Sequence, residues 1–398
     1  MITVLKNADI ANKQVIVRVD YNVPFKNGEI LDTKKIDSSF ETIDYLIENN
    51  CSIILLSHFG RVKTEEDKAS NSLKPVYDYI KSLNKYEVKF CDTPMGEKLD
   101  KMADELKEKE ILLVENTRFM DLNGKLESGN DAQLASYWAE LGEFYVDDAF
   151  GSMHRSHASV TGIPKFLPSA IGFLAEKEVT NLAPIIDVKE RPFVVIMGGA
   201  KLDDKISLIY NLIEKADFLL LGGGIANTFL KAAGFEVGSS MYSKESLDVA
   251  SSIMQEFPDK IILPKDMIVS PTYSESQYEI KSIKDIVKDD VIGDIGTEAV
   301  NNYKRFLDKA SLVFVNGTVG IYEKKEFSNG TNEILRIVSN LPCKKIVGGG
   351  DAASAVKKFG YEDKMDFIST GGGATLTYIA EGSLPGIEAL KSEQENTD

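Results

Sequence analysis

The side chains best suited to chemistry form two groups, one in each half of the chain. The first half holds all three histidines and three of the seven arginines, in the motifs SHFGR, ENTRF and HRSH: His58, Arg61, Arg118, His154, Arg155 and His157. The chain carries a net charge of −16, so clustered arginines indicate a local site for an anion. The second half carries glycine-rich turns instead. We therefore predict a small-anion site in one half and a nucleotide site in the other.

The glycine-rich turns of the second half are MGGAK at 197–201, LGGGIAN at 221–227, VGGGDAA at 347–353 and STGGGAT at 369–375. Each follows a short apolar run and precedes a helical pattern. Such a turn lets backbone N–H groups and a helix N-terminus approach a phosphate. One turn alone is also typical of an ordinary strand-to-helix corner. Four turns in one half favour a nucleotide site.

Charged residues follow two of these turns. We expect Lys201 and Lys205 to lie one helical turn apart on the same helix face. They could simply be a solvated helix start, but lysines in a first turn oppose the helix dipole, which favours an anion there. Asp351 follows the third turn and is a candidate carboxylate for magnesium.

Two familiar nucleotide motifs are absent or incomplete. No GxxxxGK[ST] occurs, which excludes a P-loop enzyme. VGGGDAA fits GxGxxA, but the next strand, DFIST, ends in Thr370 and Gly371 where a ribose-binding acid is needed. The sequence therefore argues against a dinucleotide-dependent dehydrogenase.

Two further groups in the first half have competing interpretations. Asp20 and Asn22, in RVDYNVP, could form a turn or could hydrogen-bond a substrate hydroxyl. His58 could be a core histidine, but Arg61 close to it at a strand end favours anion binding.

The pair His154 and His157 has a spacing that can hold a metal. No third ligand of fitting spacing follows, so a phosphate or carboxylate contact is favoured.

Apolar runs of strand length position all these motifs. In the first half they cover 14–20, 51–57, 111–116 and 144–149, and in the second half they are FVVIMG, FLLLGG, LVFVNG, KKIVGG and DFIST. Helical patterns alternate with them, which predicts an α/β fold with buried parallel sheets. Ligands of such sheets bind at the carboxyl ends of the strands, and every motif named above lies at such an end.

A chain of 398 residues is too long for one ordinary core, so two domains are expected. We predict an N-terminal domain over 1–168, an interdomain helix over 169–186, a C-terminal domain over 187–380 and a tail over 381–398. The last eight residues, KSEQENTD, are polar and expected to fray.

Composition limits the partners and the compartment. The net charge of −16 argues against nucleic acid and anionic membranes as partners. Cys51, Cys91 and Cys343 are far apart, with no CxxC pair, which is typical of a reducing compartment. No run approaches 18 apolar residues and MITVLKNADI lacks a signal-peptide core. We expect a cytoplasmic monomer that acts on small molecules.

The chain resembles the phosphoglycerate kinase family over nearly its whole length. The motifs RVDYNVP, SHFGR, ENTRF, DDAFGSMHRSH, RPFVVIMGGAK, GGGIANTFLKAAG, NGTVGIYE, VGGGDAA, STGGGAT and LPGI match those of the family in order. The resemblance implies two Rossmann-like domains, each a parallel sheet flanked by helices. It also implies reversible phosphoryl transfer between 1,3-bisphosphoglycerate with ADP and 3-phosphoglycerate with MgATP.

The resemblance also implies roles for individual residues. Those implied for 3-phosphoglycerate are Asp20, Asn22, Lys35, His58, Arg61, Arg118 and Arg155. Those implied for the nucleotide are Lys201, Lys205, Glu323, Gly349, Gly350, Asp351 and Ala352, with Glu323 at the ribose and Asp351 at Mg²⁺. Those implied for phosphoryl transfer itself are Lys35, Lys201, Gly350 and Gly373. The tail after LPGI is expected to pack on the first domain.

The chain departs from the family pattern at several of these positions. Lys35 aligns with a family arginine, Ala352 with a threonine and Asp147 with an asparagine. Lys35 raises one alternative, a weakly active or non-catalytic homologue that binds nucleotide. A kinase for the acyl phosphate of a different small acid is a second alternative, which the otherwise complete set of acid-site residues disfavours.

Overall fold

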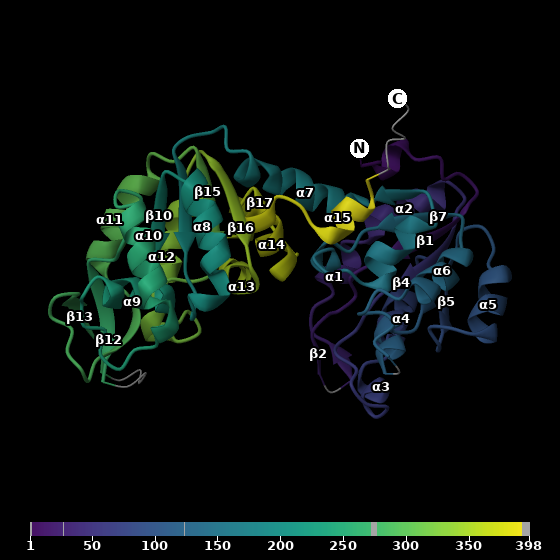
Figure 1. Ribbon diagram of the computed structural model, residues 1–398, viewed down its shortest axis with the longest axis horizontal. Helices are drawn as coiled ribbons and strands as arrows, with labels where there is room; N and C mark the ends of the chain where they lie inside the picture. Colours follow the sequence, from purple (N-terminus) through teal and green to yellow (C-terminus); the bar gives the residue numbers. More distant parts are fainter. Residues whose placement is uncertain (1, 27, 123, 272–276, 392–398) are drawn as a thin grey trace. The chain divides into compact units, whose positions relative to one another are not determined.

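The computed structural model describes residues 2–391 apart from residues 27, 123 and 272–276. The chain divides into two compact units (Figure 1). Unit 1 runs to Thr180 and also includes the segment from Ser383 onward, and unit 2 is Asn181–Gly382. The end of the expected tail, 392–398, lies outside the described residues.

Unit 1 is built on a six-stranded parallel sheet with the order β5-β6-β4-β1-β7-β8. Its strands are β1 (Gln14–Arg18), β4 (Ser52–Leu56), β5 (Glu87–Cys91), β6 (Glu110–Val114), β7 (Phe144–Asp147) and β8 (Ser169–Ile171). All five residues of β4 are buried, because helices cover both faces of a parallel sheet and its strands become continuous apolar runs.

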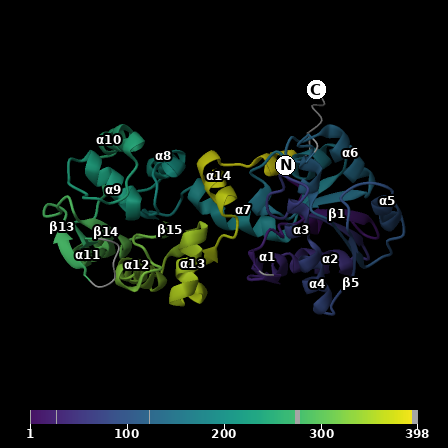
Figure 2. The same ribbon diagram turned by 90° about the horizontal axis from the view of Figure 1, so that it is seen from below.

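Most helices of unit 1 bury an apolar stripe. The helices of this unit are α1 (Lys34–Asp37), α2 (Phe40–Glu48), α3 (Asp67–Ser70), α4 (Lys74–Ser82), α5 (Glu97–Asp104), α6 (Ala132–Glu140) and α15 (Pro385–Ala389). Of these, α3 has no buried residue. Ile43 and Leu46 of α2, three residues apart, join the core formed by Val15 and Val17 of β1. Helices α2 and α4 lie on one side of the strands and α6 on the other (Figure 2). A small hairpin pairs β2 (Phe25–Lys26) with β3 (Glu29–Ile30).

The long helix expected over 169–186 is shorter than the sequence suggested. Residues 169–171 form β8, paired with β7, and α7 covers Phe173–Ile186. Ala170 and Ile171 are buried in the sheet. The buried carboxylate of Asp148 accepts a hydrogen bond from the backbone N–H of Ala175 at 3.1 Å, within the first turn of α7. The boundary between the two units falls inside this helix.

Unit 2 contains a second six-stranded parallel sheet, with the order β11-β10-β9-β15-β16-β17. Its strands are β9 (Phe193–Met197), β10 (Phe218–Leu221), β11 (Ile261–Ile262), β15 (Leu312–Asn316), β16 (Lys344–Gly348) and β17 (Phe367–Ile368). An antiparallel sheet that the sequence did not predict adds β12 (Asp266–Ser270), β13 (Glu279–Ser282) and β14 (Val291–Ile295).

The helices of unit 2 lie on both sides of its parallel sheet. They are α8 (Ile206–Lys215), α9 (Gly223–Ala232), α10 (Leu247–Glu256), α11 (Thr297–Leu307), α12 (Asn329–Ser339), α13 (Gly350–Phe359) and α14 (Gly373–Glu381). Figure 2 shows α8, α9 and α10 on one side and α11, α12 and α13 on the other. The α/β class with two flanked parallel sheets is confirmed. None of the helices in the described part of the chain combines the length and apolarity that a membrane span requires.

Candidate active site

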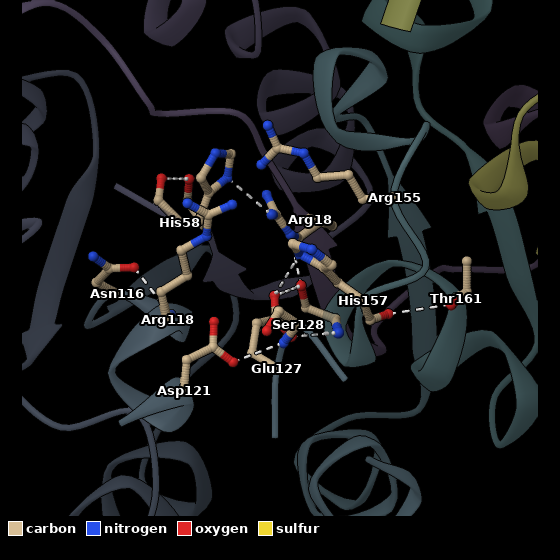
Figure 3. A network of polar contacts seen from close by, with 12 residues as sticks. Arg18, His58, Asn116, Arg118, Asp121, Glu127, Ser128, Arg155, His157 and Thr161 are labelled. Carbon is tan, nitrogen blue, oxygen red and sulfur yellow. Dashed lines mark hydrogen bonds and ion pairs between the residues drawn. The ribbon is translucent and has the colours of Figure 1, made fainter. Parts of the chain in front are cut away.

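The arginines and histidines of unit 1 gather near the carboxyl ends of its strands. Strands β6, β4, β1 and β7 are neighbours, so the loops after their carboxyl ends meet. Arg118, His58 and Arg155 come from three of these loops, and Arg18 from the end of β1 itself. Figure 3 shows the side chains of all four directed toward the same region. The structure thus brings together residues more than a hundred positions apart in sequence.

Two buried donors of this cluster have no partner among the described residues. Nε of Arg118 and Nη1 of Arg155 are buried and make no hydrogen bond to any described residue. Burial lowers the pKa of Arg118, and the nearby charge of Arg155 lowers it further. Leaving a buried charged donor unsatisfied costs several kcal/mol, on the order of 3. A bound anion would satisfy these donors and offset the repulsion, so the cluster fits an anionic ligand.

Lys35, Asp20 and Asn22 form a second group beside the cluster. Nζ of Lys35 lies 2.7 Å from Oδ2 of Asp20, whose carboxylate is mostly buried. Asp20 Oδ1 accepts a hydrogen bond from the backbone N–H of Asn22 at 3.2 Å. Asn22 Oδ1 accepts one from the N–H of Gly60 at 2.9 Å, and the carbonyl of Gly60 accepts one from Arg118 at 2.8 Å. These bonds tie the loops after β1, β4 and β6 together.

Arg61 is exposed. Within the described residues no hydrogen bond or ion pair involves its guanidinium group. Gly60, which precedes it, has a φ of +59°, a conformation that favours glycine. Arg61 is therefore placed near the rim of the cluster with its charged group available to a ligand.

The two neighbouring histidines do not form a metal site with other residues. Among the described residues, no group of three or more His, Cys, Asp or Glu side chains is arranged to hold a metal. His154 Nε2 lies 3.2 Å from Nε of Arg155. Burial lowers the pKa of His157 to about 3, and the charges of Arg18 and Arg118 add to the effect. Both histidines thus belong to the basic cluster.

Three residues of this site were not singled out from the sequence. Arg18 is fully buried, and its Nε donates to Ser159 Oγ at 2.8 Å. Ser159 in turn contacts Glu127, which is also fully buried. The available signal was one charged residue in the apolar run VIVRV.

Three of the four glycine turns of unit 2 lie at helix N-termini. Helices α9, α13 and α14 begin directly after Gly222, Gly349 and Gly372. Gly349 has a φ of +93°, and a Cβ there would lie 2.7 Å from Nδ2 of Asn316. Only glycine fits this close approach. Gly350 and Gly373 are the first residues of α13 and α14, and both are exposed, so their backbone N–H groups can face a phosphate.

The two lysines after MGGAK are not arranged as the sequence suggested. Lys201 is exposed in a loop. The 3₁₀ turn η6 covers Asp203–Lys205, and α8 begins only at Ile206. The expected pair on one turn of an α-helix is therefore wrong. Nζ of Lys205 donates to the carbonyl of Gly198 at 2.8 Å and to Asn316 Oδ1 at 2.7 Å. Lys205 thus ties the loops after β9 and β15 together.

A cavity of about 330 Å³ lies among these loops of unit 2. Gly199, Gly223, Glu323 and Asp351 are among its lining residues. Glu323 and Asp351 are both exposed. Ala352, by contrast, is buried in the hydrophobic core of unit 2 and has no polar side-chain atom to offer.

Two further polar residues that line this cavity were missed. Asn227 donates through Nδ2 to the carbonyl of Met241 at 3.0 Å, while its buried Oδ1 has no partner among the described residues. Asp294 is fully buried, and burial raises its pKa to about 8. Its carboxylate accepts hydrogen bonds from the backbone N–H groups of Ile295 at 2.9 Å and Gly330 at 2.6 Å.

Asp351 fits the carboxylate expected beside magnesium. It lies in the first turn of α13, is exposed and lines the cavity. Mg²⁺ in nucleotide sites is held by one or two carboxylates together with phosphate oxygens and water, so a single protein carboxylate suffices.

The fold and the site geometry define a two-unit α/β protein with a cluster of basic residues on one unit and a glycine-lined cavity on the other. A sequence model of the phosphoglycerate kinase family matches residues 5–382. The chain therefore belongs to the phosphoglycerate kinase family. Its curated relatives are phosphotransferases with a carboxyl group as acceptor.

Individual relatives agree with this assignment. The chain is 43% identical over 392 residues to the phosphoglycerate kinases of Listeria innocua and of Enterococcus faecalis, in each case covering 98% of this chain and 99% of the relative. It is also similar to the structure of phosphoglycerate kinase from Coxiella burnetii, with a TM-score of 0.88 and 33% identity over 98% of this chain and 99% of that one. The enzyme from Pyrococcus horikoshii gives a TM-score of 0.83 at 28% identity, with 98% of each chain covered.

Proposed function

We propose that this chain catalyses reversible phosphoryl transfer between 1,3-bisphosphoglycerate with ADP and 3-phosphoglycerate with MgATP. The buried donors of Arg118 and Arg155, which have no partner among the described residues, carry the proposal, because an anionic ligand such as a phosphorylated acid would satisfy them. Membership of the phosphoglycerate kinase family supports it. The non-catalytic alternative is not favoured, since the relatives described above are named phosphoglycerate kinases.

The substrate acid would bind in unit 1. Arg61, Arg118 and Arg155 would hold its phosphate, since guanidinium groups match phosphate oxygens in pairs. Asp20 and Asn22 would meet its hydroxyl and Lys35 its carboxylate. Asp20 and Lys35 already bond each other at 2.7 Å, so that pair is held in place before the ligand arrives.

The nucleotide would bind in unit 2. Glu323 would contact the ribose, and the turn 349–352 and Lys205 would lie near the phosphates. Asp351 would complete the shell of Mg²⁺, which supplies positive charge to the nucleotide phosphates. The lining residues of the 330 Å³ cavity support this placement.

Phosphoryl transfer needs little covalent chemistry from the protein, and positioning with charge stabilisation carries the rate. Lys35 and Lys201 would stabilise charge on the transferring group. The backbone N–H groups of Gly350 and Gly373, at helix N-termini, would hydrogen-bond the same oxygens.

A coupled assay with 3-phosphoglycerate and MgATP tests the proposal. We expect magnesium-dependent turnover that falls by at least about a hundred-fold in Lys201→Ala, in line with the loss of one electrostatic contact to the transition state. Because Lys201 is exposed in a loop, its removal should change stability by less than about 0.5 kcal/mol. Wild-type turnover no higher than that of Lys201→Ala would favour the binding-protein alternative.

We further propose a cytoplasmic monomer. Cys51, Cys91 and Cys343 are all free thiols, as expected in a reducing compartment. Light scattering coupled to size-exclusion chromatography should give a mass near 43.9 kDa. A mass near twice that value would contradict the monomer.

A further inference from the structure

The fully buried guanidinium of Arg18 is held from three directions. Nε donates to Ser159 Oγ at 2.8 Å, Nη1 donates to the carbonyl of Val19, and Nη2 lies 3.1 Å from Nδ1 of His58. Figure 3 shows the contact between Arg18 and His58. Arginine has N–H donors only and stays protonated in proteins. His58 Nδ1 must therefore be the acceptor in this contact.

This requirement determines the protonation state of the His58 ring. An imidazolium carries a proton on both nitrogens, and the other neutral tautomer carries it on Nδ1. Both would place an N–H against the N–H of Arg18. The form that remains is the neutral ring with its proton on Nε2. That nitrogen then presents a donor to a bound anion.

A buried chain of hydrogen bonds extends behind Arg18 to Ser159 and Glu127. Ser159 Oγ accepts from Arg18, so its own proton is free to go to Glu127 Oε1, 2.5 Å away. Glu127 Oε2 also accepts from the backbone N–H of Ser159 at 2.9 Å. Glu127 and Arg18 are both fully buried. The guanidinium is thereby held by Ser159 through Nε while Nη2 contacts His58.

The charges around His58 favour the same neutral form. Arg18 at the end of β1, Arg118 in η2 (Thr117–Asp121), Arg155 after β7 and Lys35 in α1 all face it with positive charge. Together with burial, which is the largest cause, they hold the pKa of His58 well below its ordinary value. The contact with Arg18 and the burial of the ring beside further positive charges thus favour the same neutral form.

We propose that Arg18, held by Ser159 and Glu127, is a positioning residue that fixes His58 as the neutral Nε2–H tautomer, so that His58 contacts the acid substrate as a hydrogen-bond donor. The contact with substrate rests on the proposed function, whereas the tautomer does not. His58 would then act neither as a cation nor as a proton acceptor during turnover.

Nitrogen-15 NMR of the intact, histidine-labelled protein tests the tautomer without any ligand. The chain has three histidines, so His58→Gln identifies the signals of His58 by their loss. We expect a protonated Nε2 and an unprotonated Nδ1 whose shifts stay constant from pH 5.5 to 8. A protonated Nδ1, or titration of His58 in this range in the wild type, overturns the proposal even if every variant fails to fold.

Two variants test the role of Arg18. In Arg18→Met we expect His58 to populate both tautomers or to titrate between pH 5.5 and 8, and kcat/KM for 3-phosphoglycerate to fall about ten-fold and become pH-dependent. Ser159→Ala, which removes only the hydroxyl behind Arg18, should show the same changes to a smaller degree. Both variants are compared with the wild type by thermal unfolding.

The outcomes separate this inference from the proposed function. A folded Arg18→Met protein with an unchanged tautomer and a flat pH profile refutes positioning by Arg18. If NMR shows the Nε2–H tautomer of His58 in a protein that lacks all kinase activity, the proposed function is refuted and with it the substrate contact. The assignment of the His58 tautomer would still stand.

Discussion

Lys35→Arg is expected to raise kcat by about ten-fold. Nζ of Lys35 is bonded to Asp20 Oδ2 at 2.7 Å. An ammonium group is a point charge, whereas a guanidinium group has five N–H donors in a planar fork. Arginine could keep the bond to Asp20 and direct a second pair of donors at the substrate. The net charge facing His58 would not change, so the rest of the basic cluster should be unaffected.

The magnitude follows from one added charge-assisted hydrogen bond, worth roughly 1.5–3 kcal/mol. The side chain of Lys35 is 33% exposed, so water competes for the new contact and the lower limit applies. About 1.5 kcal/mol corresponds to a factor of about 12 in rate. If the bond forms mainly with the transferring group, the gain appears in kcat and KM stays nearly constant.

The measurement is a steady-state comparison of kcat and KM for 3-phosphoglycerate at saturating MgATP. Lys34→Arg is the matched control, because Lys34 is the exposed neighbour in the same helix, α1. The control should leave both constants unchanged. If Lys35→Arg leaves kcat unchanged or lowers it, the site has adapted to lysine and the reasoning above is wrong.

Two further predictions concern stability and nucleotide binding. Gly349→Ala should destabilise the protein by about 1–3 kcal/mol and raise KM for MgATP, because the φ of Gly349 is +93° and the new Cβ would contact Asn316. The control is Gly360→Ala at the other end of α13, where φ is +74° and the space around the residue is open. This variant should also lose stability, but its KM for MgATP should stay unchanged. The pKa of His157 in the folded protein is lowered from 6.5 to about 3. Its contribution to the free energy of unfolding is therefore fully present above pH 6.5 and is lost as pH falls toward 3, by up to about 1.4 kcal/mol per pH unit. In His157→Gln the decline of the unfolding free energy between pH 6 and 4, measured with urea, should be shallower by that amount, and an identical slope would contradict the assigned shift.

Much of the fold follows from continuous apolar runs. β4 and β9 are buried at every residue, and such runs predict the central strands of a parallel sheet. Once the strands are placed, the shared edge of their carboxyl ends brings His58, Arg118 and Arg155 near one another. The general location of the basic cluster can thus be predicted from the sequence.

Other features could not be predicted because their signals are ambiguous locally. β13 reads EIKS and its residues are exposed or half-buried, so no apolar pattern marks it as a strand. Residues 169–171 continue an apolar helical pattern, yet they pair with β7. Arg18 is buried where the chain brings Ser159, more than a hundred residues away, into contact with it, and Glu127 lies behind Ser159. Contacts of this kind exist only in the folded chain.

The return of the chain to unit 1 has a consequence for biosynthesis. Ile387 and Leu390 are buried, the N–H of Gly386 donates to the carbonyl of Met153 at 2.8 Å, and Ile2 forms a bridge with Lys391. Unit 2 is one continuous stretch, Asn181–Gly382, so a ribosome has made all of it before it adds these contacts. During translation the unit that starts first is therefore the one that is completed last. Until then, the surface that α15 covers on it stays open to chaperones and to other nascent chains.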